Sequence, residues 1–212
     1  MLRRPARKVI LGPACGRLPP PLGRFRPGWP ICRGYGEVFM NRWIFLVLCA
    51  VGGFAADWAS KAWVLSSIPG GDVRPVLGDV LQWTLVYNPG SLFSLDPARW
   101  FPGFPTNAFL IGFNALALVA LSVFYAKLDL GQRPLIRWGV ALVVPGALGN
   151  VFDRIMGRPG VVDFIRMDFG FWPFHPWPTY NVADIWITCG IVLLFLDMLL
   201  DAIRTARKPA EA

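Results

Sequence analysis

Histidine is almost missing from this sequence, because His175 is the only one in 212 residues. The spacings CxxC and HExxH, which are typical of metal sites, do not occur, and neither does a GxSxG nucleophile elbow. His-based catalytic triads and most zinc sites are therefore set aside.

Cysteine is also scarce, and its positions do not suit disulfide bonds. Cys15 and Cys32 lie before the first long apolar run, whereas Cys49 and Cys189 lie inside such runs. No two of them lie together in a loop between the long apolar runs. A disulfide framework of the kind that small secreted proteins use is therefore excluded.

Charged residues make up only 16% of the chain, while hydrophobic residues make up 55% and aromatic residues 14%. Mean hydropathy is positive. These values indicate a membrane protein. Four apolar runs have about the 20 residues that cross a bilayer, namely 43–64, 107–125, 136–155 and 181–200. Pro145 and three glycines interrupt the third run, which transmembrane helices tolerate where neighbours satisfy the freed backbone groups.

Positive charge is distributed unevenly around these runs. Fifteen of the 21 Lys and Arg residues lie in the segments 1–42, 126–137 and 201–212. Such an excess marks the cytoplasmic side of a membrane protein. We therefore expect both termini to be cytoplasmic and the loops 65–106 and 156–180 to face outward. The net charge of +8 then follows from topology and from attraction to anionic lipid, and no nucleic-acid partner is expected.

The first 39 residues differ from the rest of the chain. They are rich in Arg, Pro and Gly and have no helical or strand periodicity, which predicts a disordered cytoplasmic tail. The apolar patch 9–11 is too short for the core of a secretory signal. Met40 shortly precedes the first apolar run, so the alternative is that translation starts there. We expect the membrane domain to span 40–204, followed by a short cytoplasmic tail at 205–212.

Polar residues inside the apolar runs cluster near one side of the membrane. Asp57 and Lys61 are four residues apart near the end of the first run, and Asn181 and Asp184 are three apart at the start of the fourth. A third cluster, at the end of the third run, contains Asn150, Asp153 and Arg154. Because consecutive spans run in opposite directions, these three ends meet at the outer leaflet. Charged side chains inside a membrane are energetically costly and normally face a bundle interior or a functional site. The sequence therefore predicts a site at the outer leaflet. The alternative for the basic residues and their acidic neighbours is that they only pair and hold the helices together.

The segment 81–88, LQWTLVYN, alternates in polarity with a period of two, which predicts a half-buried strand. Asn88, Pro89 and Gly90 then give a turn signal, whose simplest interpretation is a loop reversal. A small outward sheet with an open edge can also hold an extended peptide by strand addition. The predicted fold class is an all-α membrane protein with four transmembrane helices and a small outward-facing β-sheet and loop region.

Five short motifs resemble, in order and spacing, those of signal peptidase II, the bacterial lipoprotein signal peptidase family. They are DWASK at 57–61, NPGSLF at 88–93, GALGNVFDR at 146–154, VVDFI at 161–165 and YNVAD at 180–184. The resemblance covers about residues 40–200 and includes span number and topology. Pro145, Tyr180 and Trp58 depart from the residues that are usual in the family, and none of them is a carboxylate.

The resemblance implies that Asp163 and Asp184 are a catalytic aspartate dyad. Residues that bind substrate or orient the dyad are implied to be Asn88, Asn150, Arg154 and Asn181. Structural support is implied for Asp57, Lys61, Gly90 and Asp153. The implied reaction is cleavage of prolipoproteins on the N-terminal side of a diacylglyceryl-modified cysteine, near the outer leaflet of the bacterial inner membrane. No metal or organic cofactor is implied, and the expected partners are the prolipoprotein and membrane lipid around a monomeric enzyme.

Two neighbouring carboxylates suit this reaction for a physical reason. At low dielectric they cannot easily both ionise, so they share a proton and titrate as a pair. One can then act as general base on a water molecule while the other donates a hydrogen bond to the scissile carbonyl. The apolar run around Asp163 fits a peptide bond that is cleaved at the membrane surface.

Three other classes of protein are weighed against this interpretation. A small proton-coupled transporter or channel also carries acids and amides in its spans, but here the charges lie at one end and no inverted repeat is visible. A presenilin-like protease shares the aspartate chemistry, but the sequence has no GxGD motif. A purely structural membrane protein has no need of five polar motifs on one side.

Overall fold

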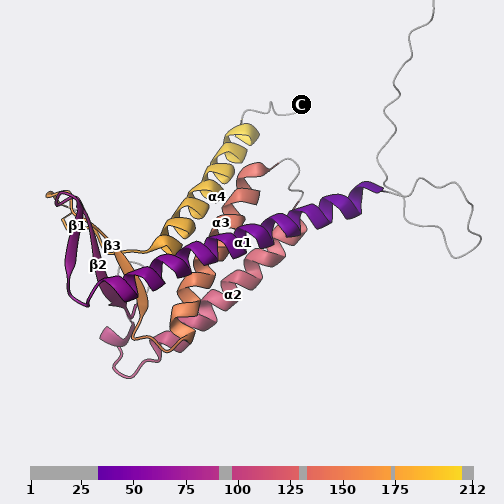
Figure 1. The fold of residues 1–212 in the computed structure, drawn as a ribbon. Coiled ribbons are helices and arrows are strands. Elements are labelled where there is room, and N and C mark those ends of the chain that lie inside the picture. The colour runs from indigo at the N-terminus through magenta and orange to yellow at the C-terminus, as the bar shows by residue number, and fades with distance from the viewer. Residues whose placement is uncertain (1–32, 91–96, 129–132, 173–174, 207–212) are drawn as a thin grey trace, which may run out of the picture.

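The computed structural model describes residues 33–90, 97–128, 133–172 and 175–206. Within these ranges the elements follow in the order α1 Arg33–Ser67, β1 Val73–Leu77, β2 Leu81–Asn88, η2 Pro97–Arg99, α2 Thr106–Lys127, α3 Pro134–Ile155, β3 Val161–Met167 and α4 Val182–Ala206. The helices form one bundle, and the strands gather at the end where α1 finishes and α4 begins (Figure 1).

All four long helices of the described ranges are apolar enough to cross a membrane, which confirms the four predicted spans. The helices extend beyond the predicted runs. α1 begins at Arg33, so the last seven residues of the predicted tail are helical, and α4 continues to Ala206. The remainder of both predicted tails, 1–32 and 207–212, lies outside the described residues. A translation start at Met40 stays a prediction.

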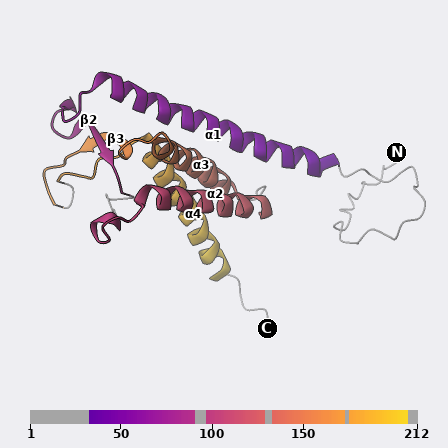
Figure 2. The ribbon, with the colours of Figure 1, turned by 90° about the horizontal axis from the view of Figure 1, so that it is seen from below.

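α3 lies at the centre of the bundle and packs against the other three helices, most extensively against α4 (Figure 2). Small residues allow this close approach. A Cβ on Gly190 of α4 would lie 2.6 Å from the Val143 side chain of α3. Pro145, which interrupts the third predicted span, fits because Gly53 of α1 leaves room for its ring: a Cβ on Gly53 would lie 2.7 Å from the Pro145 Cβ.

Replacing Gly146 by alanine is expected to lower the free energy of unfolding by about 1–3 kcal/mol, the usual cost of overpacking. The added methyl group would lie 2.7 Å from Ile187 Cγ1 and would press on the carbonyl oxygen of Ala183 in α4. Gly112 of α2 is the matched control, because a Cβ there would meet open space. Thermal unfolding in detergent should show a lower stability than that of the parent protein for Gly146→Ala only. An equal response of the two variants contradicts the packing argument.

The sheet has the order β1-β2-β3, and both pairs of neighbours are antiparallel. β2 occupies the predicted segment 81–88, which confirms that strand. The sequence pattern does not predict β1 or β3. β3 is buried without interruption from Val161 to Ile165, so its polarity does not alternate. The sheet is anchored on α1, where Val64 and Phe164 belong to one buried cluster.

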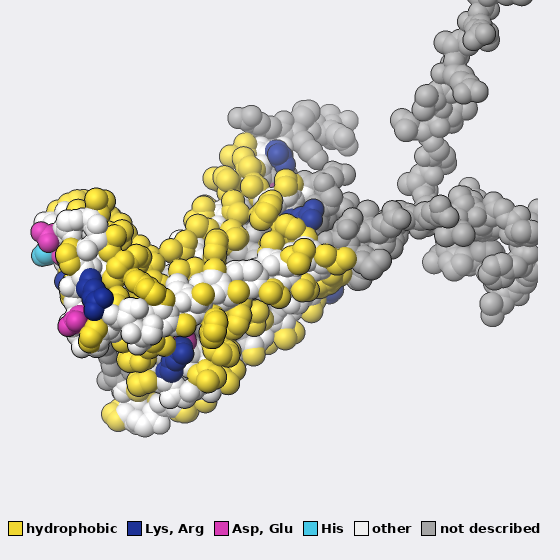
Figure 3. Space-filling model, viewed as in Figure 1, with side chains coloured by type: hydrophobic (Ala, Val, Ile, Leu, Met, Phe, Trp, Pro, Cys, Tyr) yellow, Lys and Arg dark blue, Asp and Glu magenta, His cyan; other side chains and the backbone are white. Residues whose placement is uncertain are grey.

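The outer faces of the helices are apolar, and hydrophobic side chains cover most of the helical part of the molecule (Figure 3). Large side chains such as those of Leu48, Leu116 and Phe195 are between 65% and 69% exposed. Lys and Arg side chains lie mainly towards the two ends of the bundle. This distribution is typical of a protein whose middle is surrounded by lipid. The chain is therefore a multi-pass membrane protein.

Candidate active site

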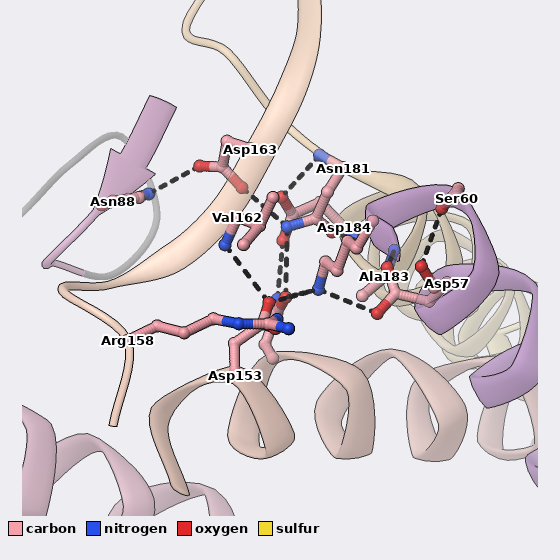
Figure 4. Close-up of polar contacts among 12 residues, drawn as sticks. Asp57, Ser60, Asn88, Asp153, Arg158, Val162, Asp163, Asn181, Ala183 and Asp184 are labelled. Carbon is pink, nitrogen blue, oxygen red and sulfur yellow. Dashed lines mark hydrogen bonds and ion pairs between the residues drawn. The ribbon is translucent and has the colours of Figure 1, made fainter. Parts of the chain in front are cut away.

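The predicted polar clusters meet at the sheet end of the bundle. There the later turns of α1 and α3 and the start of α4 converge with β3 and with the turn after β2 (Figure 4). All of the sequence-predicted site residues join one network of hydrogen bonds and ion pairs: Asp57, Lys61, Asn88, Gly90, Asn150, Asp153, Arg154, Asp163, Asn181 and Asp184.

Asp163 of β3 and Asp184 of α4, called the aspartate pair below, are joined through Asn181. Asn181 Nδ2 donates to Asp163 Oδ1 at 2.6 Å, and the Asn181 backbone N–H donates to Asp184 Oδ2 at 3.1 Å. The close-up shows Asn181 lying between the two carboxyl groups (Figure 4). Asp163 and Asn181 are both buried. Two acidic side chains thus share one partner in a site from which much water is excluded.

The start of α4 explains how one half of the aspartate pair is held. The Asp184 backbone N–H donates to Asn181 Oδ1 at 3.0 Å, while Asp184 Oδ2 accepts from the Asn181 backbone N–H. This reciprocal arrangement is a capping box, with Asn181 just before the first helical residue and Asp184 three positions later. The spacing of three in the sequence is its signal. The end of the helix therefore fixes the Asp184 carboxylate.

Asn150 of α3 holds the other oxygen of Asp184. Its Nδ2 donates to Asp184 Oδ1 at 2.9 Å. Its Oδ1 accepts from Asn181 Nδ2 at 3.2 Å and from Lys61 Nζ at 3.3 Å. An amide suits this position because it donates and accepts at the same time. Asn150 thereby links the aspartate pair to the buried charges of α1 and α3.

Asp163 has a second amide partner in the turn after β2. Asn88 Nδ2 donates to Asp163 Oδ2 at 3.0 Å, and Asn88 Oδ1 accepts from the Gly90 backbone N–H at 3.1 Å. The turn signal in the sequence is thus an Asx-type turn that points Asn88 at the carboxylate. Gly160 packs against the same turn, because a Cβ on it would collide with the Asn88 carbonyl group.

Arg154 holds this turn from the side of α3. Its Nη1 donates to the Pro89 carbonyl oxygen at 3.2 Å, and its Nη2 donates to the Gly90 carbonyl oxygen. Nη1 also donates to Asn107 Oδ1 of α2 at 2.7 Å. These bonds connect Arg154 to Asp163 through the turn and Asn88. The role of Arg154, in binding substrate or in orienting the aspartate pair, stays a prediction.

Lys61 is the centre of a buried charge cluster. Its Nζ lies 2.8 Å from Asp57 Oδ2 and 2.8 Å from Asp153 Oδ2, and the three side chains are at most 2% exposed. Each carboxylate also accepts a backbone N–H: Asp57 from Ala183 at the start of α4, and Asp153 from Val162 of β3. The cluster therefore holds both elements that carry the aspartate pair.

Three further residues of the site have no signal in the sequence. They are Asn107, Arg158 and Gly160. Arg158 pairs with Asp153, and Asn107 accepts from Arg154. Arg158 and Gly160 lie in the short connection between α3 and β3, and Asn107 lies on a helix that carries none of the five motifs. Their partners are brought to them only by the tertiary fold.

Burial and, after it, the negative charge of Asp184 raise the pKa of the Asp163 carboxyl group to about 7. The hydrogen bonds from Asn88 and Asn181 lower this pKa but do not cancel the increase. Near neutral pH the carboxyl group can therefore hold a proton or release it. This is the property that general acid–base catalysis requires.

Across the described ranges, no three His, Cys, Asp or Glu side chains are arranged to hold a metal ion. Acidic side chains of the site pair instead with Lys61, with Arg158 and with amide groups. The expected absence of a metal or an organic cofactor stays a prediction.

The fold and the aspartate pair define a multi-pass membrane protein with the acid–base groups of an aspartic peptidase. Comparison with known proteins identifies the family. Residues 49–200 match the family model described as signal peptidase (SPase) II. The chain therefore belongs to the signal peptidase II family, which confirms the resemblance found in the five motifs.

Individual relatives agree with the family match. A lipoprotein signal peptidase of Xanthomonas euvesicatoria pv. vesicatoria is 38% identical over 153 residues, which are 71% of this chain and 81% of that protein. One of Treponema denticola is 34% identical over 152 residues, which are 70% of this chain and 84% of the relative. A solved bacterial membrane enzyme has 26% identity and a TM-score of 0.64, covering 79% of this chain and 93% of that one. The predicted fold class is confirmed.

Proposed function

We propose that this chain removes signal peptides from prolipoproteins, and that Asp163 and Asp184 carry out the hydrolysis. The bond cleaved is the one on the N-terminal side of a cysteine that already carries a diacylglyceryl group. The observation that carries the proposal is the Asn181 bridge, which holds carboxyl groups of β3 and α4 in one buried site. The substrate class is supported by the curated relatives, which are lipoprotein signal peptidases.

The reaction needs one ionised and one protonated aspartate. The ionised member takes a proton from a water molecule, and the water oxygen attacks the scissile carbonyl carbon. The protonated member gives its proton to the carbonyl oxygen, which yields a gem-diol. When the C–N bond breaks, the first aspartate returns its proton to the leaving amine and the second takes one from the gem-diol. The pair then again holds a single proton.

The surrounding residues are proposed to orient the pair rather than to exchange protons. Asn88 and Asn181 hold Asp163, and Asn150 holds Asp184. Arg154 acts through the turn after β2. We propose that the strands, helices and turn that carry the pair are supported by Asp57, Lys61, Gly90 and Asp153. Both carboxyl groups thus keep one geometry, which proton transfer to a positioned water requires.

The site is proposed to lie near the outer leaflet of the bacterial inner membrane, with both termini in the cytoplasm. The excess of Lys and Arg near the termini and in the 126–137 connection supports this orientation. The sheet end of the bundle lies far from the C-terminal end of α4 (Figure 1). Because all of the site comes from one chain, we propose a monomeric enzyme surrounded by membrane lipid, with its peptidase domain at 40–204.

Cleavage is expected to slow as the pH rises through about 7, because the pKa of Asp163 is raised to about 7. Below this pH the aspartate pair keeps its shared proton. Above it both carboxyl groups are ionised, and no acid remains to protonate the scissile carbonyl oxygen. A profile of kcat/KM against pH in one detergent checks this. Activity that continues to rise well above neutral pH contradicts the shared-proton mechanism.

Cleavage of two matched precursors tests the proposal. Purified protein in detergent should cut a prolipoprotein whose cysteine carries a diacylglyceryl group and leave the unmodified precursor intact. Mass spectrometry of the products should place the cut directly before the modified cysteine. Equal cleavage of both precursors overturns the proposed substrate class. Cleavage of neither overturns the peptidase function and reopens the alternative of a proton-coupled transporter or channel, which no comparison favours.

A further inference from the structure

Asn107 connects α2 to the candidate active site. It lies in the first turn of that helix, and its Oδ1 accepts from Arg154 Nη1 at 2.7 Å. The same guanidinium donates to the carbonyl oxygens of Pro89 and Gly90. Arg154 thus joins the start of α2 to the turn after β2.

The turn matters because it carries Asn88, which donates to Asp163 Oδ2 at 3.0 Å. Arg154 can hold two carbonyl oxygens of the turn only while its planar guanidinium keeps one orientation, since its donors form a rigid fork. Asn107 accepts from the same Nη1 that serves Pro89. The Asn107 side chain therefore contributes to the orientation in which the guanidinium holds the turn.

The surroundings of Arg154 make this acceptor important. Arg154 is 7% exposed, so its guanidinium depends mainly on acceptors of the protein, of which Asn107 Oδ1 is one. Asn107 also lines, together with Pro89 and Thr106, an open hollow of about 470 Å³ beside the turn. Loss of the Asn107 oxygen would remove the acceptor that holds the guanidinium on the side of α2. A guanidinium that shifts to find another acceptor would weaken its bonds to the turn.

We infer that Asn107 is a positioning residue for peptide hydrolysis: it orients Arg154 against the turn after β2, and the turn holds Asn88 on Asp163. The inference rests on the proposed peptidase function. Asn107 is separated from the carboxyl group by these intervening partners. Its loss should therefore change the chemical step more than the binding of substrate.

Asn107→Leu tests the inference, because leucine keeps the size of the side chain and removes the acceptor. kcat is expected to fall about tenfold or more, since a displacement of about 1 Å at a reacting group is costly. KM should change much less, because ground-state binding is retained. The alkaline limb of the kcat/KM profile should move to higher pH, since the Asn88 hydrogen bond favours ionised Asp163 and its loss raises the pKa of that carboxyl group. Asp184 and Lys61, which also act on that carboxyl group, are unchanged.

Two further variants separate positioning from a general effect on packing. Asn107→Asp restores an oxygen acceptor for Arg154 and should recover most of the parental kcat. Asn114→Leu is the matched control, because Asn114 lies on the same helix and donates to the Leu110 carbonyl oxygen. It should keep the parental kinetics and pH profile. Unfolding in detergent shows whether each variant is folded, and Asn107→Ala replaces Asn107→Leu if the latter is not.

The inference is supported by a loss in kcat, a displaced pH profile and recovery in Asn107→Asp. It is overturned if Asn107→Leu keeps the parental kcat, if the loss appears only in KM, or if Asn107→Asp is as slow as Asn107→Leu. If the parent protein and Asn107→Leu cleave the lipid-modified precursor equally well, this inference alone is overturned. A parent that cleaves nothing overturns the proposed function instead.

Discussion

Replacement of Asp163 or Asp184 by asparagine is expected to abolish cleavage of the lipid-modified prolipoprotein. Asparagine keeps the shape of the side chain and can still bond the neighbouring amides, but it can neither take a proton from water nor hold the shared proton. Where several groups act as one catalytic unit, removing any one of them lowers kcat by about 10⁴-fold or more. Steady-state assays should therefore show no turnover above background for either variant.

Asp168→Asn is the matched control for the aspartate variants. Asp168 lies five residues beyond Asp163 in the sequence, but its Oδ1 contacts His175 Nδ1 at 2.5 Å on an exposed loop. This variant should keep parental activity. An aspartate variant that is folded, as judged by its unfolding midpoint, and still retains a sizeable part of the parental rate contradicts the assignment of the pair.

Replacement of Lys61 by methionine is expected to reduce the free energy of unfolding by about 3–5 kcal/mol, the usual effect of leaving a buried charge without its partner. Methionine has a similar length and no charge. Asp57 and Asp153, both 1% exposed, would then face each other without the ammonium group between them. Because these carboxylates hold the backbones of α4 and β3, activity should fall as well. Unfolding by heat or denaturant in detergent measures the loss.

Lys127→Met is the control for this prediction. Lys127 ends α2 and is exposed, so its charge is solvated and its removal should leave stability close to that of the parent. A Lys61→Met protein as stable as Lys127→Met would show that the buried cluster contributes little. The network would then have to be held by its amide hydrogen bonds instead.

The bundle could be predicted from the sequence because lipid imposes a simple constraint on each span. A helix that crosses a bilayer must be apolar for about 20 residues, so hydropathy alone marks α1, α2, α3 and α4. Alternating direction then brings the polar ends together. This is why Asp57, Asn150 and Asp184, which are far apart in the sequence, could be expected in one place, and the structure joins them in one network.

Other parts of the site depend on contacts that no local pattern encodes. β3 is buried on both faces, so Val161 to Ile165 have no alternation to mark a strand. Asn107 looks like an ordinary polar residue at a helix start, and only the fold brings Arg154 to it. Asn181 was expected near the aspartate pair, but its capping box with Asp184 becomes clear only when the start of α4 is seen.

The central claim, that Asp163 and Asp184 act as one unit, is tested most directly by comparing four proteins on the same lipid-modified precursor. These are the parent, Asp163→Asn, Asp184→Asn and the variant with both substitutions. Removing one carboxyl group of a catalytic unit should lower the rate of cleavage as much as removing both. The three variants should therefore share one background rate. If either single variant stays close to the parental rate, or if the double variant is far slower than both singles, the two carboxyl groups do not share one catalytic task.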